Sequence, residues 1–249
     1  MTSTSAVAVL ICSSDARRDV LDRVLPALLR CWRACPYPIY VGLNSTFDSI
    51  DYVRSLVAQK SDWRGEVTDQ LRQIGESHVI LVLDDYLFQR VVDQERLSVL
   101  VAEALKRDVP YLRLLPLGKS LAGRLKALMR LRPKGDIEPI PAGRPFYSSM
   151  QISLWKKTHL LGMLDRPGSI WDFEHRHDTG VVHYSICRSS PFVYQHLVER
   201  GRWLPYAGKL LARAGMSTDL GARKVWSPWI RVKLIADEIR FHLLGYGIH

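Results

Sequence analysis

The sequence lacks several features that mark well-known classes of protein. No apolar run approaches the roughly 20 residues that cross a bilayer, which excludes an integral membrane protein. The first apolar run, residues 6–12, has no basic segment before it and no small-residue cleavage site after it, so it predicts a buried strand and not a signal peptide. Four cysteines in 249 residues form neither a disulfide framework nor the spacing of a common zinc site. We therefore expect a reducing, cytoplasmic compartment.

Positive charge is what the chain has in excess. Its 35 Lys and Arg against 25 Asp and Glu give a formal net charge of +10, and 47% of its residues are hydrophobic, which excludes wholesale disorder. The length allows one large α/β domain or two small ones with a substantial core. An excess of this size favours an anionic partner, namely nucleotide phosphates, nucleic acid or an acidic membrane surface.

Short apolar runs alternate with helical patterns in the first half of the chain. The patterns predict strands at 6–12, 39–43, 78–83 and 111–115, and helices at 17–34, 51–74 and 93–106. This order predicts an α/β fold of the Rossmann type, with a mostly parallel sheet flanked by helices. Ligands of such sheets bind beyond the carboxyl ends of the strands. The first places to look for a site are therefore 12–15, 43–45, 84–85 and 115–116.

The second half of the chain is more basic. Residues 119–134 carry a helical pattern rich in Lys and Arg, and we expect a strand over 146–154 followed by a helix over 155–164. In residues 223–244, tryptophans interleave with basic residues. That arrangement suits an anionic membrane interface, and it equally suits a terminal amphipathic helix that packs on the domain with its cations in water.

Two adjacent carboxylates, Asp84 and Asp85, end the apolar run 78–83. Mutual repulsion and desolvation would raise their pKa values unless a cation or hydrogen-bond donors offset both effects. A divalent cation shared with a diphosphate would do so, because Mg²⁺ and Mn²⁺ accept carboxylate and phosphate oxygens together. The alternative is a strand-to-helix turn in which Asp85 caps a helix.

Residues 79–88, Val-Ile-Leu-Val-Leu-Asp-Asp-Tyr-Leu-Phe, resemble the metal-binding aspartate motif of GT-A-fold glycosyltransferases. Residues 146–155 and 169–174 resemble the acceptor-side segment of the bacterial surface-polysaccharide (lipopolysaccharide or capsule) members of that group. The resemblance covers most of residues 6–203, and it departs from the usual Asp-x-Asp spacing because position 86 is Tyr. It implies a nucleotide-sugar donor, a saccharide or lipid-linked saccharide acceptor, and a divalent metal, Mn or Mg.

The resemblance also implies roles for particular residues. Asp84 would contact the ribose or an outer-shell water, and Asp85 would bind the metal that neutralises the leaving diphosphate. His196 would supply a further metal contact, with His183 as a competing candidate. The residues expected to meet the donor nucleotide are Ser13, Asp15, Arg17, Asn44, Trp63 and Asp84. Each could instead be a cap or turn residue.

Inverting transfer needs a base that takes the acceptor proton, and Glu174 is the first candidate, with Asp172 the second. Trp171 and Glu174 are three residues apart and share one face if the segment is helical. An indole beside a carboxylate suits a sugar site, since it covers an apolar sugar face. The acceptor pocket is expected to be lined by Gln151, Trp155 and Trp171. Alternatively, the aromatic side chains are core residues and Glu174 pairs with Arg176 or His177.

These observations predict one catalytic domain over 1–203, with a nucleotide-sugar half at 1–118 and an acceptor half at 119–203. A basic, aromatic, helical segment at 204–249 would follow, and the protein could then sit peripherally at the inner face of a membrane. A nucleotidyltransferase is one alternative, although such enzymes carry a Gly-rich loop after the first strand and residues 12–17 contain no glycine. A non-enzymatic module that binds nucleic acid or a membrane is another. Nucleic acid is the least supported partner, because no such motif is present.

Overall fold

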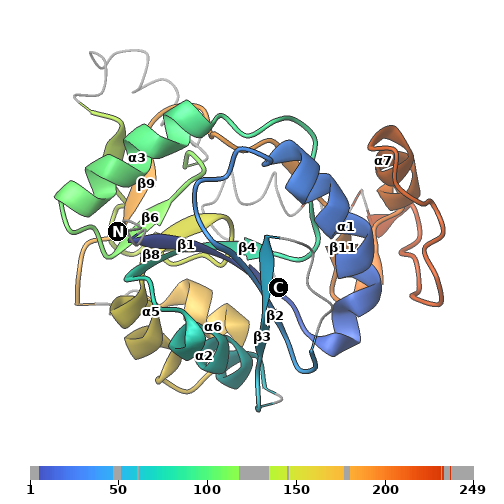
Figure 1. The fold of residues 1–249 in the computed structure, drawn as a ribbon, viewed down its shortest axis with the longest axis horizontal. Helices are drawn as coiled ribbons and strands as arrows, with labels where there is room; N and C mark the ends of the chain where they lie inside the picture. The colour runs from blue at the N-terminus through green and yellow to red at the C-terminus, as the bar shows by residue number, and fades with distance from the viewer. Residues whose placement is uncertain are drawn as a thin grey trace.

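An eight-stranded sheet lies between two layers of helices in the computed structural model (Figure 1). The structure describes residues 6–46, 52–60, 62–117, 135–144, 146–176 and 180–230, together with residues 232 and 236. The elements of the first half are β1 (Val7–Cys12), η1 (Asp15–Arg17), α1 (Arg18–Cys31), β2 (Ile39–Leu43), β3 (Val53–Val57), α2 (Trp63–Gln73), β4 (His78–Leu83), β5 (Tyr86–Phe88), α3 (Gln94–Lys106) and β6 (Tyr111–Arg113). Those of the second half are β7 (Ile137–Pro139), β8 (Ser153–Lys156), α5 (Lys157–Leu164), α6 (Ile170–His175), β9 (Tyr184–Ile186), β10 (Tyr194–His196), β11 (Val198–Glu199), β12 (Arg202–Trp203) and α7 (Ala207–Arg213).

The strands of the large sheet are ordered β3-β2-β1-β4-β8-β6-β9-β7. The first four are mutually parallel. Because β8 is antiparallel to both β4 and β6, strands β4 and β6 run in the same direction, and β9 is parallel to β6. The predicted α/β class with a mostly parallel sheet is confirmed. The carboxyl ends of β1, β4 and β6 therefore share one edge with the beginning of β8.

Both faces of the sheet are buried, which explains why its strands read as apolar runs without alternation. In β1, Val9 and Ile11 pack with α1 and α3, whereas Ala8 and Leu10 pack with α2, α5 and α6. Figure 1 shows these two groups of helices on opposite sides of the sheet.

Two predicted elements differ from the structure. The helix expected over 51–74 is replaced by the edge strand β3 and the shorter helix α2, because the Asp62 side chain accepts a hydrogen bond from Gly65 N (3.0 Å) and caps a new helix start. The strand expected over 146–154 is reduced to β8. Phe146 has a φ of +55°, in the left-handed region that a strand excludes. The basic stretch 119–134 lies outside the described residues.

The helix α7 and the residues around it, in the described part of the predicted C-terminal segment, pack against α1. Trp203, Ala207 and Leu211 bury their side chains against Val20 and Val24 of α1. The Arg223 guanidinium also contacts the Asp19 carboxylate at 2.6 Å. Figure 1 shows α7 beside α1. Within the described part of the chain, no helix has the length and apolar character needed to cross a membrane.

Candidate active site

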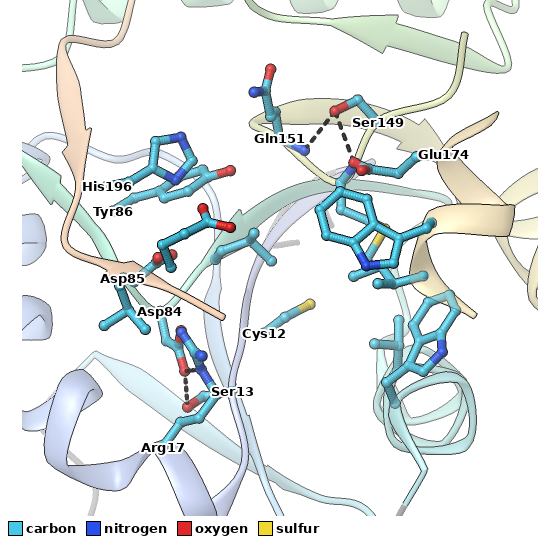
Figure 2. Close-up of a pocket in the computed structure, with 18 of the residues that line it drawn as sticks. Cys12, Ser13, Arg17, Asp84, Asp85, Tyr86, Ser149, Gln151, Glu174 and His196 are labelled. Atoms are coloured by element: carbon cyan, nitrogen blue, oxygen red, sulfur yellow. Dashed lines mark hydrogen bonds and ion pairs between the residues drawn. The ribbon is translucent and has the colours of Figure 1, made fainter. Parts of the chain in front are cut away.

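A cavity of about 690 Å³ opens where the carboxyl ends of β1, β4 and β6 meet (Figure 2). Further walls come from the start of α2, the segment before β8, α6 and the β11–β12 hairpin. Nine of the thirteen predicted site residues line it, namely Ser13, Arg17, Trp63, Asp84, Asp85, Gln151, Trp171, Glu174 and His196. The structure therefore brings the predicted donor, metal and acceptor residues into one space.

The Asp84 carboxylate is 2% exposed and is held by donors from the end of β1. Ser13 Oγ donates to Asp84 Oδ2 at 2.7 Å. Arg17 Nε donates to the same oxygen at 2.7 Å, and Arg17 Nη2 donates to Oδ1 at 2.6 Å. This bidentate pair offsets the cost of burying the carboxylate. Asp84 thus joins the ends of β1 and β4 and fixes the orientation of Arg17.

Asp85 has a different environment. Its side chain is 5% exposed, and burial together with the charge of Asp84 raises its pKa to about 7. The alternative in which Asp85 caps a helix is wrong, because β5 begins at Tyr86. Asp85 O accepts from Leu197 N at 3.1 Å, which joins Asp85 to the residue that follows β10.

His196 lies beside Asp85 because β10 pairs with β5 and places His196 opposite Tyr86. The two rings have centroids 4.6 Å apart, and Figure 2 shows His196 and Asp85 on the same wall of the cavity. Burial lowers the pKa of His196 to about 4, so the imidazole is neutral at pH 7, the form that binds metals. Among the described residues, no group of three or more His, Cys, Asp or Glu side chains could hold a metal ion.

His183, the competing candidate for a metal contact, is buried away from the cavity. Its Nε2 lies 2.9 Å from His159 Nε2, and its ring stacks on Tyr147 with centroids 4.7 Å apart. Burial lowers its pKa to about 3. The structure gives His183 a place in the core.

Glu174 faces the cavity from α6, on the wall opposite Asp85 (Figure 2). Ser149 Oγ donates to Glu174 Oε1 at 3.1 Å, and Met150 N donates to the same oxygen at 2.8 Å. Burial raises the pKa of Glu174, and these two hydrogen bonds oppose that rise. Arg176, an expected alternative partner, instead donates to the backbone oxygens of Met163 and Pro167, and residue 177 lies outside the described residues.

The other candidate base, Asp172, has a structural role at the start of α6. Ser169 N donates to Asp172 Oδ2 at 2.7 Å, and Asp172 N donates to Ser169 Oγ at 3.2 Å, which completes a capping box. Asp172 does not line the cavity. Trp171, by contrast, is 42% exposed and lines the cavity together with Glu174, as the spacing of three residues predicts.

Three more predicted residues lie outside the cavity lining. Asp15 N donates to Asn44 Oδ1 (3.1 Å) and Asn44 N donates to Asp15 Oδ1 (3.0 Å), so this pair joins the loops after β1 and β2. Trp155 is fully buried, with its ring centroid 4.3 Å from that of Tyr111. Its Nε1 donates to Ser153 Oγ at 2.9 Å. The cap and packing alternatives describe these three residues.

Sequence reasoning missed several charged residues of the cavity. Arg113 ends β6 and donates to Gln151 Oε1, and Arg144 precedes β8. Arg200 and Gly201 form the two-residue turn between β11 and β12, with φ values of +46° and +73°. Positive φ at both positions is typical of a type I′ hairpin turn, and the Arg-Gly pair was the available signal. Glu199, beside this turn, also lines the cavity, and burial raises its pKa.

The structure has the mostly parallel sheet flanked by helices that the sequence predicts. No protein-family model and no curated protein sequence matches the chain. Among solved structures, the chain is similar to S. aureus TarS, with 12% identity and a TM-score of 0.45 over 78% of this chain and 37% of that chain. It is also similar to S. aureus TarS 1–349 in complex with UDP-GlcNAc, with 11% identity and a TM-score of 0.41 over 72% and 57% of the two chains.

A third similar structure is CMP:2-keto-3-deoxy-manno-octonic acid synthetase complexed with CTP, with 10% identity and a TM-score of 0.37 over 68% and 81% of the two chains. The chain thus spans between 37% and 57% of the two TarS chains. TM-scores below 0.5 do not assign a function, so the evidence for function lies in the residues of the cavity.

Proposed function

We propose that this protein is a glycosyltransferase that transfers a sugar from a nucleotide-sugar donor to a hydroxyl group of a saccharide or lipid-linked saccharide, in bacterial surface-polysaccharide synthesis. The observation that carries the proposal is the pair of carboxylates on opposite walls of one cavity, Asp85 at the end of β4 and Glu174 on α6. Asp85 is buried and Glu174 is half-buried, and burial raises the pKa of each. Perturbed carboxylates facing one cavity are typical of catalytic sites.

The donor nucleotide would bind at the ends of β1 and β4. Arg17, oriented by Asp84, supplies a cation for the diphosphate, and Trp63 supplies an aromatic face from the start of α2. Since hydrogen bonds from Ser13 and Arg17 occupy both oxygens of the Asp84 carboxylate, Asp84 would position Arg17 more directly than it would bind the ribose.

Asp85 and His196 would hold a divalent metal, Mn²⁺ or Mg²⁺. The donor set fits, because a buried carboxylate with a raised pKa stands beside a neutral imidazole. Two protein ligands also suit a cation that takes its remaining ligands from phosphate oxygens and water. When bound, the metal would stabilise the negative charge on the leaving diphosphate.

Glu174 would act as the base. The acceptor oxygen forms a bond to the anomeric carbon, the bond from that carbon to the diphosphate oxygen breaks, and the acceptor proton moves to Glu174. Ser149 and Met150 hold Oε1, so the carboxylate is oriented before substrate binds. Trp171 lies on the same side of α6 and would cover an apolar sugar face. This assignment predicts inversion at the anomeric carbon.

The direct test is calorimetric titration of UDP, GDP, CDP and TDP in the presence of Mn²⁺, followed by a hydrolysis screen of the matching sugar nucleotides. We expect one nucleoside diphosphate to bind with Mn²⁺, and Asp85→Asn to weaken that binding at least tenfold. Asp165→Asn is the matched control, because Asp165 is exposed at the end of α5. Absence of binding to all four nucleotides with Mn²⁺ or Mg²⁺ would rule out the proposed function.

We also propose an anionic membrane surface as a partner of the region around Trp229. Trp229 is 78% exposed, and Val225 and Val232 are 48% and 58% exposed, beside the exposed Lys224. Exposed indole and valine side chains next to a cation suit the interface of an anionic bilayer. Trp226 is used internally, since its Nε1 donates to Glu199 O at 2.8 Å.

A further inference from the structure

Arg113 reaches the cavity from the carboxyl end of β6, with only part of its guanidinium paired. Its Nη2 donates to Gln151 Oε1, whereas its Nε is buried without a hydrogen-bond partner. A buried charged donor without a hydrogen-bond partner loses its hydration without compensation, and this destabilises the folded protein. An acceptor atom from a ligand would remove that destabilisation.

A second arginine, Arg144, lines the same cavity from the segment before β8. Burial and then the positive charge of Arg113 lower the pKa of Arg144, and the attraction of Glu138, which opposes this, is smaller. Arg113 in turn lowers the pKa of Glu174, so Glu174 offsets part of its charge. The two guanidinium groups therefore repel each other in a half-buried wall. An anion bound between them would attract both and so offset that repulsion.

The position of the two arginines separates them from the donor phosphates. Arg113 bonds Gln151, and Figure 2 shows Gln151, Ser149 and Glu174 together on one wall while Ser13, Arg17 and Asp84 lie across the cavity. A diphosphate at the ends of β1 and β4 already has Arg17. An anion at Arg113 would accordingly belong to a different part of the substrates.

We propose that Arg113 and Arg144 form an anion subsite that binds a phosphate or carboxylate group of the acceptor. Guanidinium groups suit this task because their planar donors match both oxyanions. The assignment of the anion to the acceptor rests on the proposed glycosyltransferase function, whereas anion binding by the two arginines does not. The acceptor class is then an anionic saccharide or a polyol phosphate, with its attacking hydroxyl near Glu174.

The test uses glycerol 1-phosphate and gluconate as anionic probes and glycerol as the neutral control, in saturation-transfer NMR on the full chain. Wild-type protein should bind one of the two anionic probes with UDP and Mn²⁺ present, and glycerol should not bind. Arg144→Gln and Arg113→Gln should each weaken probe binding at least tenfold. Arg54→Gln, which removes a cation from the opposite edge strand β3, should leave it unchanged.

Several results would overturn the proposal. Failure of wild-type protein to bind either anionic probe would do so, as would binding that is unaltered in both Arg144→Gln and Arg113→Gln. Displacement of the probe by UDP would also overturn it, because the probe would then lie at the diphosphate site. If Arg144→Gln lost affinity for UDP-glucuronate but not for UDP-glucose, the anion would come from the donor sugar and not from the acceptor. If the proposed glycosyltransferase function is wrong, wild-type protein will bind no nucleoside diphosphate, and this result is distinct from loss of anion binding.

Discussion

Replacing Asp85 with Asn should stabilise the protein while removing its ability to bind the metal. Burial and the charge of Asp84 raise the pKa of Asp85 from 3.8 to about 7. Between these two pH values the folded state keeps a proton that the unfolded chain has lost, so the free energy of unfolding falls as the pH rises. Asn carries no charge at any pH, and the variant escapes that loss.

The size of the effect follows from the two pKa values. A rise from 3.8 to about 7 destabilises the folded protein by about 4 kcal/mol once the carboxyl is ionised in both states. Water entering the cavity relaxes part of this cost, so we expect Asp85→Asn to raise the free energy of unfolding by about 2–4 kcal/mol at pH 8. At pH 3.5 the difference should be close to zero, because the wild-type carboxyl is protonated in the folded state and largely so in the unfolded state.

The assay is urea unfolding of the metal-free protein at pH 3.5, 6 and 8, followed at pH 8 with Mn²⁺ and the cognate nucleotide. Both ligands together should stabilise wild-type protein and leave Asp85→Asn unchanged. Asp165→Asn, on the surface, should stay within about 0.5 kcal/mol of wild type at every pH. A difference between wild type and Asp85→Asn that does not grow with pH would refute the reasoning, because the ionised carboxylate would then carry no burial cost.

Three further changes test other parts of the cavity and the surface. Glu174→Gln keeps the oxygen that accepts from Ser149 and Met150, so the fold should persist while turnover of the sugar nucleotide falls roughly 10²–10⁴-fold; undiminished turnover would remove the base assignment. In wild type, turnover should fall as the pH drops towards the raised pKa of Glu174, above its ordinary value of 4.5. Arg17→Met leaves the Asp84 carboxylate buried without its cation and should cost about 3 kcal/mol in urea unfolding, the low end for a buried pair because Arg17 is 32% exposed; adding Asp84→Asn should recover part of that loss, and no recovery would contradict the pairing. Trp229→Ser should reduce sedimentation with phosphatidylglycerol vesicles, with phosphatidylcholine vesicles as the control, and equal partition of both proteins would exclude that surface.

The wall of the cavity at the ends of β1 and β4 could be predicted because it depends on neighbouring parallel strands. β1 and β4 are recognisable as apolar runs, and they pair in register from Val7 with His78 to Cys12 with Leu83. Whatever follows each run must then meet at one edge, which brings Ser13 to Asp84. The opposite wall, which carries Arg113 and Gln151, depends on β8, which enters the sheet antiparallel between β4 and β6. No local sequence pattern specifies the insertion of β8. Arg113 was missed because β6 ends at residue 113, whereas the apolar run predicted a strand that continues to residue 115.

The polar residues that were predicted for the site but lie outside the cavity have side chains that can either bind a ligand or hydrogen-bond the backbone. Asp172 was a plausible base, yet it lies three residues after Ser169, which is the spacing of a capping box and a signal present in the sequence. Asp15 and Asn44 are at strand ends, where side chains can bind ligand or bond the neighbouring loop. Here each satisfies a backbone N–H of the other. A polar side chain within reach of an unpaired backbone group is therefore a weaker site candidate than one without such a partner.

The clearest case is the pair Asp84 and Asp85, two identical residues with different roles. The two residues form the turn between β4 and β5, so their carboxylates meet different neighbours. Ser13 and Arg17 reach Asp84, whose charge is neutralised within the protein. Asp85 is nearly as buried, and burial and the charge of Asp84 raise its pKa to about 7, although the charge of Arg17 opposes that rise. An ionised Asp85 at neutral pH is consequently destabilising until a cation binds, and for this reason the proposed metal site uses Asp85 and not Asp84.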